Sequence, residues 1–148
     1  MFDEGHGLLA EGVDYARRAA RDSAEVLDRI ARFVTLHPGS DGDFVHLEVA
    51  AAFRWTVSFA QSRIGLAVAL TTRLPATFMA MRAGVVDEFK ARRIMEATEV
   101  LSDEVCARVE AELAAQAGEL NMRQLSDRLR RAVARADPAA GDGADGGT

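Results

Sequence analysis

The stretch 48-EVAAAFRWTVSFAQSRI-64 decides the fold, and its first residue is its only acid. Two small residues, Ala50 and Ala51, allow close helix packing, and Thr56 is well placed to be the N-cap of a second helix. Two helices joined by a turn of three or four residues are typical of a DNA-binding helix-turn-helix. The same pattern also fits two helices that only pack against each other in an α-helical bundle.

The remainder of the chain is helical in pattern as well, and no alternating strand pattern occurs. Asp43 and Asp87 are expected N-caps, and Asn121 with Gln124 resembles a capping box. The predicted helices cover about 8–36, 44–54, 57–72, 75–83, 87–101, 102–117 and 121–136. We therefore expect an all-α fold with about seven helices in an irregular bundle, including a helix-turn-helix-like segment near residues 44–72.

A chain of 148 residues has the size of one domain. We expect residues 1–136 to form a single helical domain, with a long first helix at 8–36 and a core at 44–136. Residues 137–148 contain only Asp, Pro, Ala, Gly and Thr, and no large apolar side chain could anchor them. This segment is therefore expected to be a disordered tail.

Several protein classes are disfavoured by composition. Cys106 is the only cysteine, so an intrachain disulfide is impossible, and its apolar stripe predicts a small buried side chain. Phe89 is expected to face the core in the same way. No apolar run has the length of a membrane span, and the N-terminus lacks the basic segment of a signal peptide. We expect a cytoplasmic protein with no membrane contact.

Charge is distributed unevenly along this acidic chain, whose net charge is -5. In the first helix, acids precede arginines at i,i+4 in three pairs: Asp14 and Arg18, Glu25 and Arg29, and Asp28 and Arg32. From residue 49 to residue 86 there is no acid at all, although that segment contains Arg54, Arg63, Arg73 and Arg82. The last helix carries a second basic group, formed by Arg123, Arg128, Arg130, Arg131 and Arg135.

Two interpretations of these arginines remain open. Basic segments in an otherwise acidic protein are common in nucleic-acid-binding proteins, because phosphate neutralisation supplies most of their affinity. Alternatively, the fold brings distant carboxylates, such as those of Glu96, Glu99 or Glu104, into ion pairs with the arginines.

The DNA-binding interpretation specifies five contact residues. If the second helix of the motif lies in the major groove, Ser58, Gln61 and Arg63 face the duplex. Arg54 and Arg73 then flank it toward the phosphates.

Other residues favour the packing interpretation. Arg54 occupies the turn position at which such motifs usually have glycine, because the backbone there has a positive φ. Val57 and Phe59 make the presumed reading face apolar, and Gly65 weakens the helix midway.

No catalytic constellation is evident. His6, His37 and His46 are scattered, and no cysteine or histidine has metal-ligand spacing. We expect no catalysis by this chain, no cofactor, no metal and no small-molecule substrate.

The order of several short motifs resembles the actinobacterial domain-of-unknown-function family 222, also called the thirteen-E-twelve repeat family. The motifs are Leu74-Pro75-x-Thr77, Gly84-x-Val86-Asp87 and Lys90-Ala91-Arg92, and residues 109–138 are similar as well. The resemblance covers about residues 44–138, with Asn121 where threonine is more usual.

Members of that family often continue into a C-terminal HNH endonuclease domain, and this chain ends about where the nuclease would follow. The resemblance implies a non-catalytic helical domain, an accessory region that associates with duplex DNA. The alternative is a protein-interaction or dimerisation module, binding itself or another protein, with no nucleic-acid role.

Overall fold

The computed structural model describes residues 2–37 and 42–136 of the chain. These residues form seven α-helices and no strand, which confirms the predicted all-α class. The helices are α1 (Phe2–Thr35), α2 (Gly42–Phe53), α3 (Val57–Thr72), α4 (Pro75–Arg82), α5 (Glu88–Thr98), α6 (Asp103–Ala117) and α7 (Met122–Ala136). The predicted tail at 137–148 lies outside the described residues.

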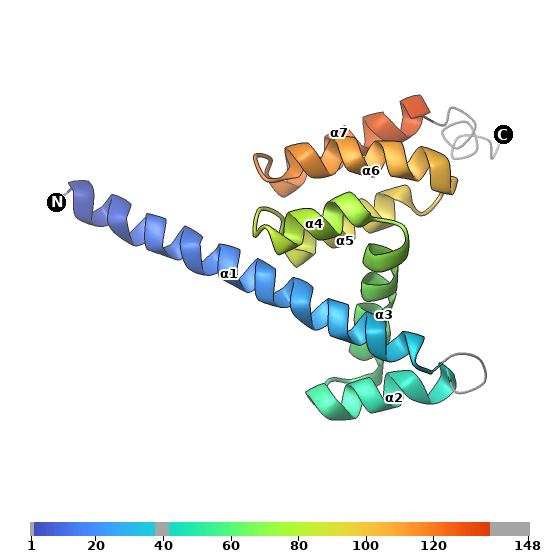
Figure 1. Ribbon diagram of the computed structural model, residues 1–148. Coiled ribbons are helices and arrows are strands. Elements are labelled where there is room, and N and C mark those ends of the chain that lie inside the picture. The colour runs from blue at the N-terminus through green and yellow to red at the C-terminus, as the bar shows by residue number, and fades with distance from the viewer. Residues whose placement is uncertain (1, 38–41, 137–148) are drawn as a thin grey trace.

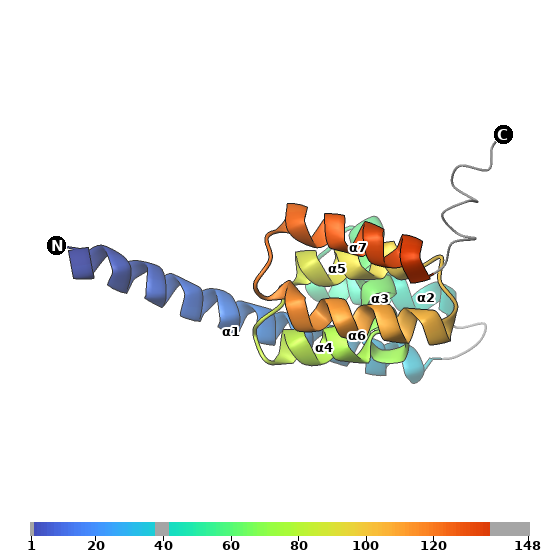
Figure 2. The ribbon, with the colours of Figure 1, turned by 90° about the horizontal axis from the view of Figure 1, so that it is seen from above.

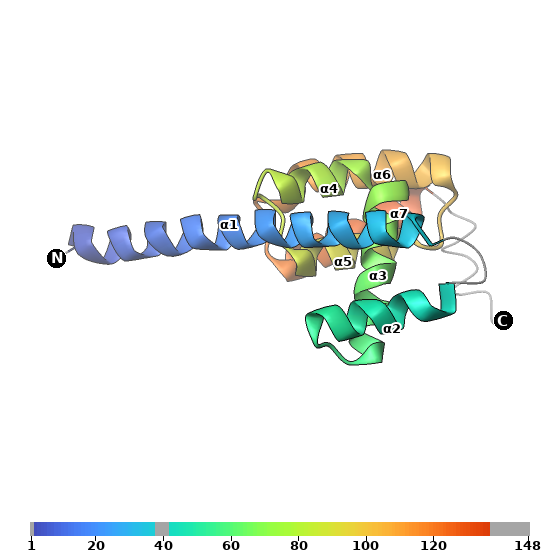
Figure 3. The same ribbon diagram turned by 60° about the horizontal axis from the view of Figure 1, so that its bottom comes forward.

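The helices form a compact body from which half of α1 projects (Figure 1). The C-terminal half of α1 packs on α3 and α4, and α2 packs on α3 at one end of the molecule. At the other end, α6 packs on α4, α5 and α7, and α5 also contacts α4 and α7, with α6 and α7 side by side (Figure 2). Figure 3 shows that α1 crosses α3 and then extends beyond every other helix.

The core is built from aliphatic side chains, as the low aromatic content indicates. Its largest fully buried members include Leu27, Leu66, Leu70, Met81 and Ile94. Cys106 is buried, as predicted. Phe89, in contrast, is 77% exposed, so the prediction that it faces the core is wrong. It lies in the first turn of α5, whose buried face is formed by Ala91, Ile94 and Thr98.

Local capping explains where most helices begin. The Thr56 hydroxyl accepts a hydrogen bond from Phe59 N at 3.1 Å, and the Asp87 carboxylate accepts one from Lys90 N at 2.9 Å. Asn121 N donates to the Gln124 side chain at 3.0 Å, and Gln124 N donates back at 2.9 Å, which confirms the capping box.

Two helix starts differ from prediction. The first helix begins at Phe2 rather than near residue 8, although Gly5 and Gly7 are poor helix formers. The second begins at Gly42, so Asp43 lies inside the helix and not at its N-cap.

A buried carboxylate holds the start of α4. Pro75 is at the first position of this helix, where its missing N–H costs nothing. The next two backbone amides, Ala76 N and Thr77 N, donate to Glu110 of α6 at 3.1 and 2.9 Å, and the Thr77 hydroxyl donates at 2.8 Å. Glu110 is only 1% exposed. The Leu-Pro-x-Thr motif is thereby explained structurally, because its threonine binds a carboxylate that comes from another helix.

No single helix of the described residues is long and apolar enough to cross a membrane. The helices α3 and α4 reach that length only as a pair, and the pair is bent by 106°.

Candidate nucleic-acid interface

The turn between α2 and α3 has the backbone expected of a glycine. Arg54 has a φ of 58°, and Trp55 N donates to Ala50 O at 2.9 Å. A hydrogen bond that spans six residues and encloses a residue in the left-handed conformation, here Arg54, is the Schellman motif that ends many helices. The chain can therefore turn within three residues into α3, at the cost of backbone strain at Arg54.

Three of the five predicted contact residues are exposed. Ser58 and Arg54 are exposed, and Gln61 is exposed at the edge of a cavity that α1 and α2 also line. Their contact with DNA remains a prediction. Val57 and Phe59 are 41% and 44% exposed on the same helix, so the exposed surface of α3 is partly apolar.

Arg63 is turned into the molecule rather than toward solvent. Its side chain is 13% exposed, and its Nη2 lies 2.8 Å from Glu88 Oε1. The guanidinium also stacks over the Trp55 ring at 4.8 Å, a cation–π contact. Burial lowers the pKa of the Arg63 guanidinium below its usual value, and Glu88 partly offsets this effect. Because Ser23 of α1 donates to the same carboxylate at 2.6 Å, Arg63 helps to join α1, α3 and α5.

Arg73 is likewise used within the fold. Its Nη1 donates to Thr98 O at 3.1 Å, and its Nη2 donates to Leu101 O. Its Nε lies 3.1 Å from Asp103 Oδ1. The side chain therefore binds two carbonyls at the end of α5 and just beyond it.

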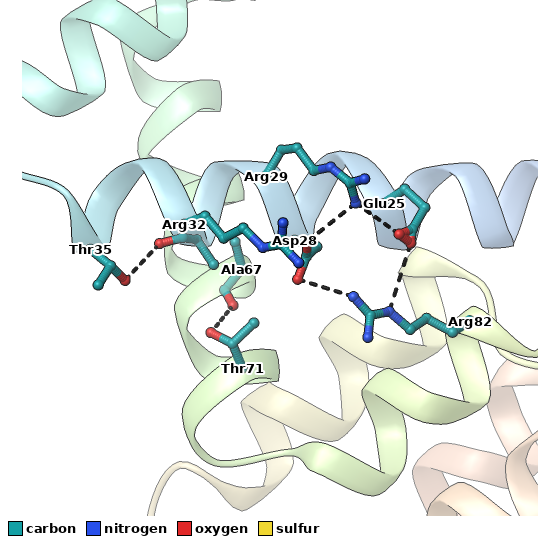
Figure 4. Close-up of polar contacts among 9 residues, drawn as sticks. Glu25, Asp28, Arg29, Arg32, Thr35, Ala67, Thr71 and Arg82 are labelled. Atoms are coloured by element: carbon teal, nitrogen blue, oxygen red, sulfur yellow. Dashed lines mark hydrogen bonds and ion pairs between the residues drawn. The ribbon is translucent and has the colours of Figure 1, made fainter.

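The fourth arginine of the acid-free segment, Arg82, binds the first helix (Figure 4). Its Nη2 lies 3.0 Å from Asp28 Oδ1 and its Nε lies 3.8 Å from Glu25 Oε2. The same two acids bind Arg29 and Arg32, which confirms those i,i+4 pairs. Arg18 instead lies 5.2 Å over the Tyr15 ring.

The ion-pair interpretation therefore applies to three of the four arginines, but with carboxylates other than those proposed. Glu88, Asp103, Glu25 and Asp28 are the partners, whereas Glu96, Glu99 and Glu104 make no ion pair within the part of the chain described.

The basic group of α7 has a different environment. Arg123, Arg131 and Arg135 are exposed and have no hydrogen bond or ion pair to any of residues 2–37 and 42–136. Arg128 donates to Gln116 at 2.8 Å, and Arg130 pairs with Asp127 at 2.9 Å, both at the surface.

Two adjoining cavities of about 520 and 420 Å³ lie between α6 and α7. They share Glu112 and Arg135 among their lining residues. We call their basic lining, formed by Arg108, Arg128, Arg131 and Arg135, the arginine groove. Sequence reasoning noted the α7 members, but Arg108 was missed because it lies on another helix.

The described part of the chain contains no group of side chains that could bind a metal ion. No group of three or more histidine, cysteine, aspartate or glutamate side chains is arranged to hold a metal ion there.

Comparison with known proteins gives a family but no activity. Residues 9–146 match the model of the family described as "Domain of unknown function (DUF222)". No curated protein and no solved structure matches the chain. Since the match covers nearly the whole sequence, this all-helical chain belongs to the DUF222 family.

Proposed function

We propose that this chain is a non-catalytic module that associates with duplex DNA through the arginine groove, and not by reading bases with α3. The observation that supports this proposal is the clustering of arginines without carboxylate partners on α6 and α7. Arg108, Arg131 and Arg135 have no such partner among the described residues, whereas Arg63, Arg73 and Arg82 do.

Guanidinium groups without carboxylate partners are free to bind the phosphate groups of DNA. A planar guanidinium donates two parallel hydrogen bonds to phosphate oxygens, and it stays charged at physiological pH. Releasing the counterions that surround DNA then favours binding, and the affinity depends steeply on salt. Such contacts carry no base information, so the expected binding is independent of sequence.

The net charge of -5 does not prevent this role, because the charges are separated along the molecule. The helix α7 contains five arginines and one acid, Asp127, whereas residues 2–14 of α1 contain four acids and no lysine or arginine. The acidic end would be repelled by DNA, so the charge distribution favours an approach with α7 forward. A DNA-binding role agrees with the cytoplasmic location expected from the sequence.

The test is binding of the full chain to a mixed-sequence duplex across a salt series. Replacing Arg131 and Arg135 by alanine should weaken binding and flatten the slope of log affinity against log salt by about 1.8, because each phosphate contact contributes about 0.9. The matched control is Arg29→Ala with Arg32→Ala, which removes the same charge from exposed side chains of α1. Equal effects of the two pairs would contradict the proposal.

A gain-of-affinity variant separates binding from folding. Glu112 is the acid that lines both cavities. Glu112→Gln should strengthen DNA binding, because it removes a negative charge near the phosphates, and misfolding cannot mimic that result. Unchanged or weaker binding would count against the arginine groove.

Self-association is a second candidate function. It is favoured by the exposed apolar side chains in the N-terminal half of α1, namely Leu8, Leu9, Val13 and Tyr15.

A further inference from the structure

The projecting half of α1 carries large apolar side chains that are exposed to solvent in a single copy of the chain. Residues 3–19 are all exposed, and they extend about 25 Å at the rise of an α-helix. Within them Leu8 is 66% exposed, Leu9 73%, Val13 51% and Tyr15 66%. The ribbon views show the N-terminal part of α1 leaving the body (Figures 1–3), whereas Val13, Ala16 and Arg17 lie beside the α4–α5 turn and the end of α6.

The exposed apolar stripe continues a buried one. Leu9, Val13 and Ala16 follow one another at intervals of four and three residues, and Ala20, Ala24 and Leu27 carry the same pattern on. The last three are 5%, 0% and 0% exposed, because they pack against the body. The face that holds α1 in the fold therefore runs on toward the N-terminus, where Leu9 and Val13 stay exposed.

Glycine content indicates that this segment needs a packing partner. Gly5, Gly7 and Gly12 lie inside the helix, where glycine is among the least favourable residues. A helix of this length gains most of its stability from packing an amphipathic face. A Cβ added at any of the three glycines would meet no atom within 4 Å, so the backbone surface there is open for close approach.

Charge along the segment is self-complementary. Asp3 lies in its first turn, and Arg17 lies near its end on the same side of the helix. Arg17 has no ion pair within the described residues. An identical helix running in the opposite direction would place Asp3 of each copy near Arg17 of the other.

We propose that the projecting halves of α1 from two copies of this chain pair antiparallel about a two-fold axis. The stripe of Leu9 and Val13 forms the centre of the contact, and the axis passes near Leu9. The acidic tip of each helix ends near Arg17 of the other copy. A cavity of about 460 Å³ beside Arg17 leaves room for this tip. The cavity is lined by Val13, Ala16 and Arg17 together with Gly84, Val85 and Gly118. This inference goes beyond DNA association and does not depend on it.

The first test is the oligomeric state of the full chain without DNA, measured by sedimentation equilibrium. The wild-type protein should be dimeric at about 100 µM, which is within reach of a modest interface. Leu9→Glu with Val13→Glu should raise the dimer Kd by roughly 100-fold or more, since both apolar side chains lose their burial. The control is Phe89→Glu with Val100→Glu, which adds the same charge at exposed apolar sites outside α1.

A charge exchange tests the direction of pairing. Asp3→Arg should weaken the dimer by about three- to tenfold, because the symmetric contact is lost twice, and Arg17→Glu should do the same. Both changes in one chain should restore the dimer, because the ends are again complementary. A parallel pair would not be restored.

Three results would overturn the proposal: a wild-type chain that is monomeric up to about 1 mM, a dimer that survives Leu9→Glu with Val13→Glu, or an exchange of charge at Asp3 and Arg17 that is as weak as either single change. Loss of dimerisation with intact DNA binding, or the reverse, would show which of the two proposals fails.

Discussion

Replacing Glu110 by alanine should be among the most destabilising single changes in this protein. Its carboxylate accepts hydrogen bonds from Ala76 N, Thr77 N and the Thr77 hydroxyl, at 2.8 to 3.1 Å. Thr77 is 0% exposed, so water cannot take over the bonds that it loses.

The magnitude follows from the donors left behind. Each buried donor without a partner costs about 1–3 kcal/mol. Thr77 has two such donors, and Ala76 N is only partly buried and can reach water. Part of the loss is offset, because alanine no longer requires a charge to be held away from water. We expect a loss of about 2–5 kcal/mol in the free energy of unfolding.

Chemical denaturation followed by far-ultraviolet circular dichroism measures this loss. Thr77→Val is the matched variant, because it removes only the hydroxyl and should cost about 1–2 kcal/mol. The double variant should be less destabilised than the sum of the two single variants, since both changes act on one network. A loss below about 0.5 kcal/mol for Glu110→Ala, or strict additivity of the two changes, would refute the reasoning.

Two further predictions concern the residues with positive φ. Arg54→Gly should raise the free energy of unfolding by up to about 1 kcal/mol, because relief of left-handed strain exceeds the added freedom of the unfolded chain; a decrease on thermal denaturation would contradict this. Gly84 has a φ of 80°, and an added Cβ would lie 3.0 Å from Arg17 O, so Gly84→Ala should cost about 1–2 kcal/mol or more. A melting temperature equal to wild type would show that the α1–α4 contact can relax.

Local patterns predicted most of the helices because the interactions that start and end a helix span only a few residues. Thr56, Asp87 and the Asn121–Gln124 pair cap the helices that they were expected to cap. The largest boundary error is at the start of α1, where the glycines lowered the predicted helicity.

The candidate site could be predicted only in part. The sequence shows which arginines lack an acid within a few residues, but it does not show which distant carboxylates the fold brings close to them. Arg63 and Arg73 find theirs 25 and 30 residues away, at Glu88 and Asp103. Arg108 was missed for the same reason, because its place in the arginine groove depends on α6 lying beside α7.

The sequence by itself determined the all-helical class, the order of the helices, the caps at Thr56, Asp87 and Asn121, and the identity of the family. These follow from hydrogen bonds and apolar periodicity within a few turns. Tertiary structure alone decided which charges remain available and which apolar faces stay uncovered. It buries Glu110 and exposes Phe89, against their ordinary preferences, because packing between distant helices determines which side chains can reach water.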